Sequence, residues 1–145
     1  MIYPDKEEFL RLARQCNVIP VFQEMTADIE TPVSLFKKVA KGPESFLLES
    51  VEGGERWGRY SFIGHRPQLL IKIWGEQIEV SRGNGQPMQL KANPLAYLKD
   101  LMDDYQALPV TGLPRFYGGL VGYMGYDMVR FFERLPDSKP DDVGM

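Results

Sequence analysis

The chain has 145 residues, of which 43% are hydrophobic and 26% are charged, a composition that is typical of a globular domain and excludes a disordered segment. Its 17 basic and 20 acidic residues give a net charge of −3, and the few arginines around His65 are too sparse to form a basic face for nucleic acid. No apolar run is long enough to cross a membrane and the acidic first residues do not resemble a basic signal peptide, so we expect a cytoplasmic protein that binds neither nucleic acid nor membranes.

The first 40 residues predict two helices joined by an extended segment. Asp5, with Glu8 three residues later, has the pattern of a capping box, and apolar residues then recur at helical spacing up to Cys16. Residues 18–24 are expected to be extended, and Pro20 indicates an edge position for them. Thr31-Pro32 predicts the start of a second helix with an apolar stripe.

The middle of the chain predicts β-structure. Short apolar or alternating runs are separated by glycine-containing turns, as in antiparallel hairpins. We expect Gly64 to close the second strand, and we expect His65 to lie in an exposed loop beyond it. The expected strands span residues 46–48, 59–63, 68–74, 77–81 and 88–90.

The last third of the chain predicts a helix, a strand and a short helix before a polar tail. Asn93-Pro94 repeats the combination of a cap residue and a proline, and apolar residues follow at helical spacing to Tyr105. Residues 116–123 are expected to form a strand and residues 126–133 a short helix. The sum is an α+β domain over residues 1–145, with a mainly antiparallel sheet and about three flanking helices.

A carboxylate and a hydroxyl end the first predicted strand. Glu49 and Ser50 follow the apolar run directly, and Arg59 leads into the next strand nine residues later. Such a cluster at a sheet edge has acceptors for an ammonium group and for an indole or amide N–H. The alternative is an ordinary strand end, in which Glu49 is solvated and Ser50 caps a turn.

A glycine-rich segment between Tyr117 and Asp127 resembles a phosphate-binding loop only superficially. Phosphate loops lead from a strand through a tight glycine turn into a helix, often with lysine support, whereas these glycines lie among aromatic residues and no lysine follows. We interpret the segment as structural packing, in which Tyr117, Tyr123 and Tyr126 fill the space above the missing side chains.

Known catalytic and metal-binding motifs are absent from the sequence. It has no G-x-S-x-G elbow, no Walker loop and no His-Glu-x-x-His pair. One cysteine and one histidine exclude an internal disulfide and a Cys/His zinc cluster. We therefore assign no catalytic residue and no metal ligand.

Three segments, in this order, resemble the N-terminal region of anthranilate synthase component I, and the resemblance covers essentially the whole chain. This family is the large subunit of the lyase that makes anthranilate from chorismate in tryptophan biosynthesis. Component I of aminodeoxychorismate synthase, in the folate branch, shares much of the pattern and is the alternative. The segments are residues 46–50, 58–64 and 118–123, and the last continues into Tyr126-Asp127 and residues 130–133.

The resemblance implies that this chain is the N-terminal part of a longer protein. Family members are roughly three times as long, and their chorismate- and magnesium-binding residues lie in the C-terminal part. We therefore expect no catalysis and no cofactor in this chain, Mg²⁺ in the full-length parent, and a glutamine amidotransferase subunit as its partner. Both sequence halves build one large β-sandwich in the family, so the isolated chain is expected to self-associate through uncovered apolar surface.

The resemblance also implies an allosteric L-tryptophan site for feedback inhibition. Ser50 matches the family's motif with Glu49 beside it, and Tyr60-Ser61 is expected to form the facing wall. Glu49 is expected to bind the ligand's ammonium group together with backbone carbonyls near Ser50, and Arg59 is the candidate for its carboxylate. Two other readings stay open: a stand-alone module that binds a small ligand, and a scaffold for subunit contact.

Overall fold

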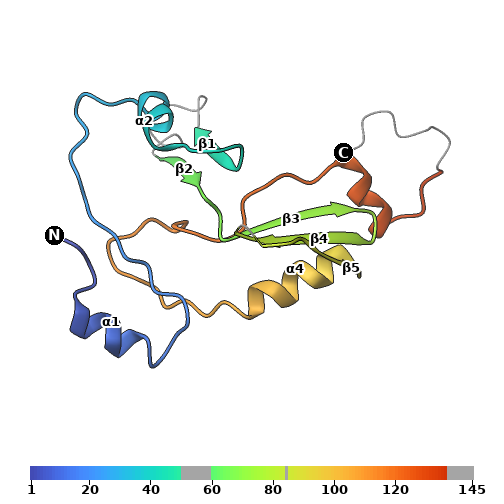
Figure 1. Cartoon of the computed structure of the whole chain (residues 1–145), viewed down its shortest axis with the longest axis horizontal. Coiled ribbons are helices and arrows are strands. Elements are labelled where there is room, and N and C mark those ends of the chain that lie inside the picture. The colour runs from blue at the N-terminus through green and yellow to red at the C-terminus, as the bar shows by residue number, and fades with distance from the viewer. Residues whose placement is uncertain (50–59, 84, 137–145) are drawn as a thin grey trace. The chain divides into compact units, whose positions relative to one another are not determined.

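The computed structural model describes residues 1–49, 60–83 and 85–136 (Figure 1). These residues build a mixed α+β structure of small antiparallel sheets and a few helices. They group into two compact units. The first comprises the described residues of Met1–Phe22, Ile73–Ile78 and Leu90–Met145, and the second comprises those of Gln23–Lys72 and Glu79–Gln89.

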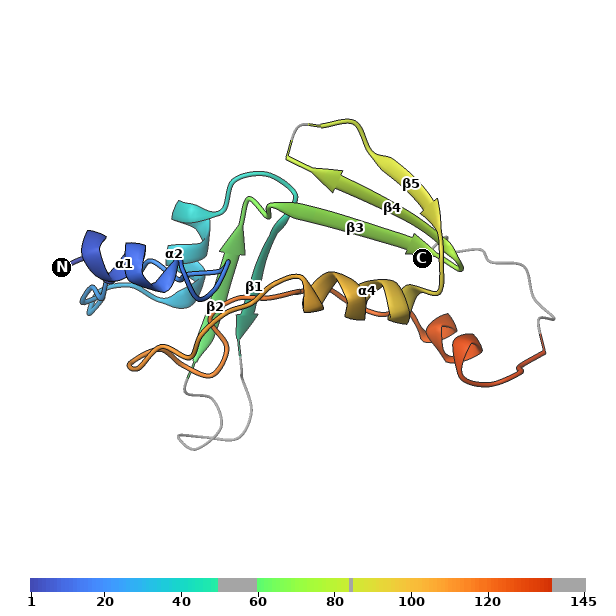
Figure 2. The same cartoon turned by 90° about the horizontal axis from the view of Figure 1, so that it is seen from below.

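Three strands form the larger sheet, in the order β3-β4-β5. They are β3 (Leu69–Trp74), β4 (Gln77–Arg82) and β5 (Met88–Lys91), which lie side by side in Figure 2. Gly75 adopts a φ of 57° in the tight turn between β3 and β4, a conformation that favours glycine. Ile78 and Val80 are 1% and 4% exposed, so alternate residues of β4 bury one face of this sheet. The three strands predicted here are confirmed.

Two strands form the smaller sheet, β1 (Ser45–Glu49) and β2 (Ser61–His65). They are antiparallel, and Leu47 lies opposite Ile63. The sequence placed the end of β2 two residues too early, because Gly64 pairs with Phe46 and the ladder continues. His65 is therefore the exposed last residue of the strand, and the expectation of a loop there was wrong.

Each of the three α-helices among the described residues begins directly after its predicted cap residue. They are α1 (Lys6–Leu12), α2 (Pro32–Val39) and α4 (Pro94–Asp103). The side chain of Asp5 accepts a hydrogen bond from the backbone N–H of Glu8, but the Glu8 carboxylate pairs with Arg11 and does not complete a capping box. α1 ends at Leu12, earlier than predicted, and tighter turns follow it up to Cys16.

The segment predicted to be extended at 18–24 makes isolated β-bridges. Phe22 pairs with Tyr3, and Val18 pairs with Ala107. The two bridges join this segment to different parts of the chain, so no continuous ladder forms.

Residues 116–123, all of which the structure describes, form no strand, so that prediction was wrong. Glycines supply no side chain for cross-strand packing, which weakens a strand at this position. The 3₁₀ helix η1 (Tyr126–Phe131) confirms the short helix. Tyr123 and Tyr126 are 79% and 86% exposed, and a Cβ at Gly118 would meet no atom within 4 Å. These rings therefore do not fill the space above the glycines, and the packing interpretation was wrong.

The longest helix among the described residues has ten residues. No helix in this part of the chain is long and apolar enough to cross a membrane.

Candidate functional site

The smaller sheet brings two of the predicted site residues together. Glu49 is the last residue of β1, Ser61 is the first residue of β2, and the two lie directly opposite each other in the antiparallel ladder. Opposed residues in such a ladder have Cβ atoms about 4.5–5.5 Å apart and project from the same face. Both side chains are exposed. A carboxylate and a hydroxyl are thus available side by side at this end of the sheet.

Of the other three predicted residues, the structure describes only Tyr60. Ser50 and Arg59 lie outside the described residues. Tyr60 is 53% exposed, and its ring centroid lies 6.2 Å from that of Phe62. Because side chains alternate along a strand, Phe62 projects from the face opposite to Ser61. Tyr60 therefore packs with an aromatic residue of the other face.

The pair next to Glu49 and Ser61 on their own face is apolar. Leu47 and Ile63 lie opposite each other two positions further along the ladder, and both are half-buried. The carboxylate and the hydroxyl are therefore followed by a short hydrophobic surface. This arrangement suits a small molecule that carries a cationic amine and an apolar group.

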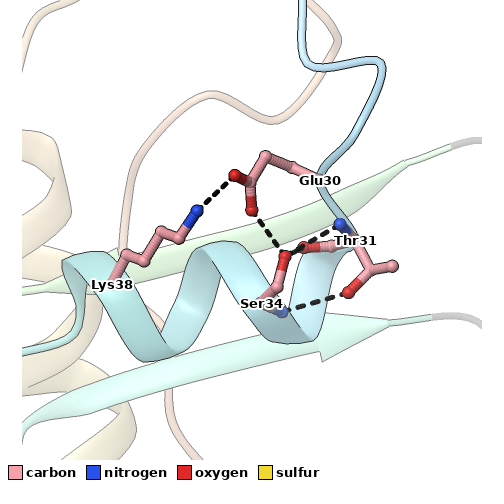
Figure 3. A network of polar contacts seen from close by, with 4 residues as sticks. All are labelled: Glu30, Thr31, Ser34 and Lys38. Carbon is pink, nitrogen blue, oxygen red and sulfur yellow. Dashed lines mark hydrogen bonds and ion pairs between the residues drawn. The ribbon is translucent and has the colours of Figure 1, made fainter.

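Helix α2 lies against both strands of this sheet, as Figure 3 shows. Its first turn is closed by a reciprocal capping box. The hydroxyl of Thr31 accepts a hydrogen bond from the backbone N–H of Ser34 (3.1 Å), and the hydroxyl of Ser34 accepts one from the backbone N–H of Thr31 (2.9 Å). Thr31-Pro32 predicted this helix start, but the reciprocal bond that the Ser34 hydroxyl accepts was not foreseen.

An ion pair extends this network along the helix (Figure 3). The ammonium group of Lys38 pairs with the carboxylate of Glu30, which also accepts a hydrogen bond of 2.6 Å from the hydroxyl of Ser34. The hydrogen bond from Lys38, followed by that from Ser34, lowers the pKa of Glu30 below its usual range. Glu30, which directly precedes the cap residue Thr31, thereby links the start of α2 to its last turn.

Sequence analysis did not identify the close contact between Phe46 and Gly64. A Cβ built on Gly64 would lie 2.1 Å from Cε1 and 2.4 Å from Cζ of Phe46, so the ring occupies the space of the missing side chain. A glycine within a strand often marks such a close approach. That signal was present in the sequence, but the identity of the opposing residue depends on the register.

A shallow hollow of about 430 Å³ lies elsewhere, at the N-terminus, and contains none of the five predicted site residues. Both carboxylates in its lining already have partners, because Asp5 caps α1 and Glu8 pairs with Arg11 at 2.6 Å. Its lining consists of Met1, Ile2, Tyr3, Asp5 and Glu8.

The part of the chain that the structure describes contains no group of three or more His, Cys, Asp or Glu residues placed to hold a metal ion.

No family model matches the chain, but comparison with curated proteins finds relatives along its whole length. It is 43% identical over 145 residues to anthranilate synthase component 1 of Acetivibrio thermocellus. This match covers 100% of the chain and 29% of that protein. It is 46% identical over 144 residues to the protein of that name from Pseudomonas aeruginosa, and this match covers 97% of the chain and 29% of that protein. The Synechocystis protein of that name is 40% identical over 153 residues, and this match covers 100% of the chain and 30% of that protein.

The chain is homologous to anthranilate synthase component 1. The homologous part is the N-terminal region, and the chain spans about 29% of the length of these curated relatives. The resemblance seen in the sequence is therefore confirmed. The segments that carried it overlap β1 and β2 and include the glycine-rich run before η1.

Proposed function

We propose that this chain is the N-terminal regulatory region of an anthranilate synthase component 1, and that it contributes the site where L-tryptophan inhibits the conversion of chorismate to anthranilate. Two observations support the proposal. The first is the homology along the whole chain to proteins that bear this name, which favours it over the aminodeoxychorismate branch. The second, which carries the assignment of the site, is the opposition of Glu49 and Ser61 at the end of the smaller sheet.

The chemistry of L-tryptophan matches this end of the sheet. In the proposed complex the carboxylate of Glu49 accepts hydrogen bonds from the ligand's ammonium group, and the hydroxyl of Ser61 lies beside it. Leu47 and Ile63 supply apolar surface for the indole ring. The resemblance adds Ser50 beside the ammonium group, Arg59 for the ligand carboxylate and Tyr60 as part of the wall.

Feedback inhibition in this proposal is a coupling between two sites of a longer protein. The catalytic groups, Mg²⁺ and chorismate belong to the remainder of that protein, and a glutamine amidotransferase subunit is its partner. L-tryptophan inhibits because it binds one conformation more tightly than another, and such couplings are typically about 1–3 kcal/mol.

The test is an inhibition assay on the longer protein that carries this region. Glu49→Lys places an ammonium group where the ligand's own ammonium binds, so we expect the L-tryptophan concentration for half-inhibition to rise by about 30-fold or more, as for the loss of one partner of a hydrogen-bonded charge pair, while turnover without L-tryptophan is unchanged. Glu44→Lys makes the same charge change at an exposed glutamate five residues earlier and is the matched control. The control should retain normal inhibition.

Normal sensitivity of the Glu49→Lys enzyme would refute the assignment of the site. An enzyme whose wild-type form is insensitive to L-tryptophan would refute the regulatory function itself.

A further inference from the structure

We propose that Phe46 and Gly64 set the register of β1 and β2 and thereby hold Glu49 opposite Ser61. They are positioning residues, because neither is needed to touch the ligand. The link to L-tryptophan rests on the proposed function, whereas the claim about the register rests on the contact between the two strands.

The contact between Phe46 and Gly64 is specific for glycine. The two residues are direct cross-strand partners, and a Cβ on Gly64 would lie 2.1, 2.4 and 3.0 Å from Cε1, Cζ and Cδ1 of the Phe46 ring. Carbon atoms attract each other best at about 3.5–4.0 Å, so even a methyl group would displace the ring by more than 1 Å. The ring therefore lies across the backbone of β2 at the one position where this strand has no side chain.

Little else in this sheet defines the register. It has two strands and five residue pairs, and such a ribbon is marginally stable by itself. The pairs Leu47–Ile63 and Leu48–Phe62 are apolar on both sides, and apolar pairs tolerate exchange of partners. The pair of an aromatic ring and a glycine does not, because only glycine leaves room for the ring.

A change of register would dismantle the polar pair of the site. A shift by two residues keeps each side chain on its face, but it places Phe46 opposite Phe62 or Arg66. In the same two registers Glu49 lies opposite residue 59 or Ile63. In neither register does it face Ser61, so the carboxylate and the hydroxyl are no longer neighbours.

The experiment compares variants of the whole 145-residue chain with two readouts. Cross-strand backbone NOEs between Glu49 and Ser61 report the register, and titration with L-tryptophan reports binding. Gly64→Ala should lose these NOEs and weaken L-tryptophan binding by at least about tenfold. The double variant Gly64→Ala with Phe46→Leu removes the two ring atoms nearest to the new methyl group, and it should recover both readouts in large part.

Two controls separate positioning from general loss of stability. Gly118→Ala adds the same methyl group where no atom lies within 4 Å, and it should leave both readouts unchanged. Thr31→Ala removes the cap of α2 and should cost about 1 kcal/mol of stability without altering the register or the affinity of the folded chain.

Retention of the NOEs and of the affinity in Gly64→Ala would overturn the inference, and so would a double variant that recovers neither. A wild-type chain that shows the NOEs but binds no L-tryptophan would overturn the assignment of the L-tryptophan site to this sheet, while the NOEs of Gly64→Ala would still decide the claim about the register.

Discussion

Asn17 joins two segments that are far apart in the sequence. Its side-chain amide donates a hydrogen bond of 2.7 Å to the backbone carbonyl of Asp104 and accepts one of 2.7 Å from the backbone N–H of Gln106. Its own backbone N–H donates to the carbonyl of Gln106 at 3.1 Å. One residue thus satisfies backbone groups just beyond the end of α4.

Asn17→Ala should destabilise the chain by about 1–2 kcal/mol, because two side-chain hydrogen bonds are lost and two backbone groups lose their partners. Urea unfolding followed by circular dichroism measures this change. Gln15→Ala, which removes an exposed amide from the preceding turn, is the matched control. If the Asn17→Ala and Gln15→Ala variants unfold at the same urea concentration, the side-chain hydrogen bonds of Asn17 contribute nothing to stability.

At the level of elements, the stability of α2 depends on the charge of Glu30. Its carboxylate has a lowered pKa in the folded chain because it pairs with Lys38 and Ser34. A lowered pKa contributes stability that is present above the ordinary carboxyl pKa and is lost as the pH falls through the lowered value. Acidification should therefore weaken the link between the cap and the last turn of α2.

Glu30→Gln should reduce the melting temperature at neutral pH, and the difference from the wild type should narrow as the pH falls into the range where Glu30 is protonated. Thermal melts at several pH values provide this comparison, with Glu24→Gln as a control at an exposed glutamate upstream. A difference that stays constant across the pH range would contradict this role of Glu30.

Elements with local signals were predictable from the sequence, and those that depend on distant partners were not. Asp5, Thr31 and Asn93 identified the starts of the α-helices, because a cap residue acts on the backbone of its own first turn. The strand predicted at 116–123 failed, since a local run of aromatic and apolar residues does not supply a neighbouring strand. The opposition of Glu49 and Ser61 likewise required the register, which no single segment contains.

At the scale of the whole molecule, the chain corresponds to less than a third of its curated relatives and exposes many large apolar side chains. Several lie in and after the glycine-rich segment, where Met124 is 64% exposed and Phe132 is 71% exposed. Exposed apolar surface of this kind is typical of regions that contact another protein surface.

The isolated chain should therefore self-associate. We expect its weight-average mass in light scattering to rise with protein concentration, and the rise to be smaller when Tyr123 and Tyr126 are both replaced by serine. Replacement of Thr111 by serine is a control at an exposed polar residue. A mass equal to that of the monomer at every concentration would contradict this expectation.

The most direct test of the L-tryptophan site is an NMR titration of the 145-residue chain in which each backbone amide is followed separately. L-tryptophan should shift the amide signals of Glu49 and Ser61 most strongly, together with those of Leu47 and Ile63, and L-phenylalanine should shift them less. Unchanged signals at these four residues, or shifts confined to the N-terminal hollow around Tyr3 and Glu8, would contradict the site.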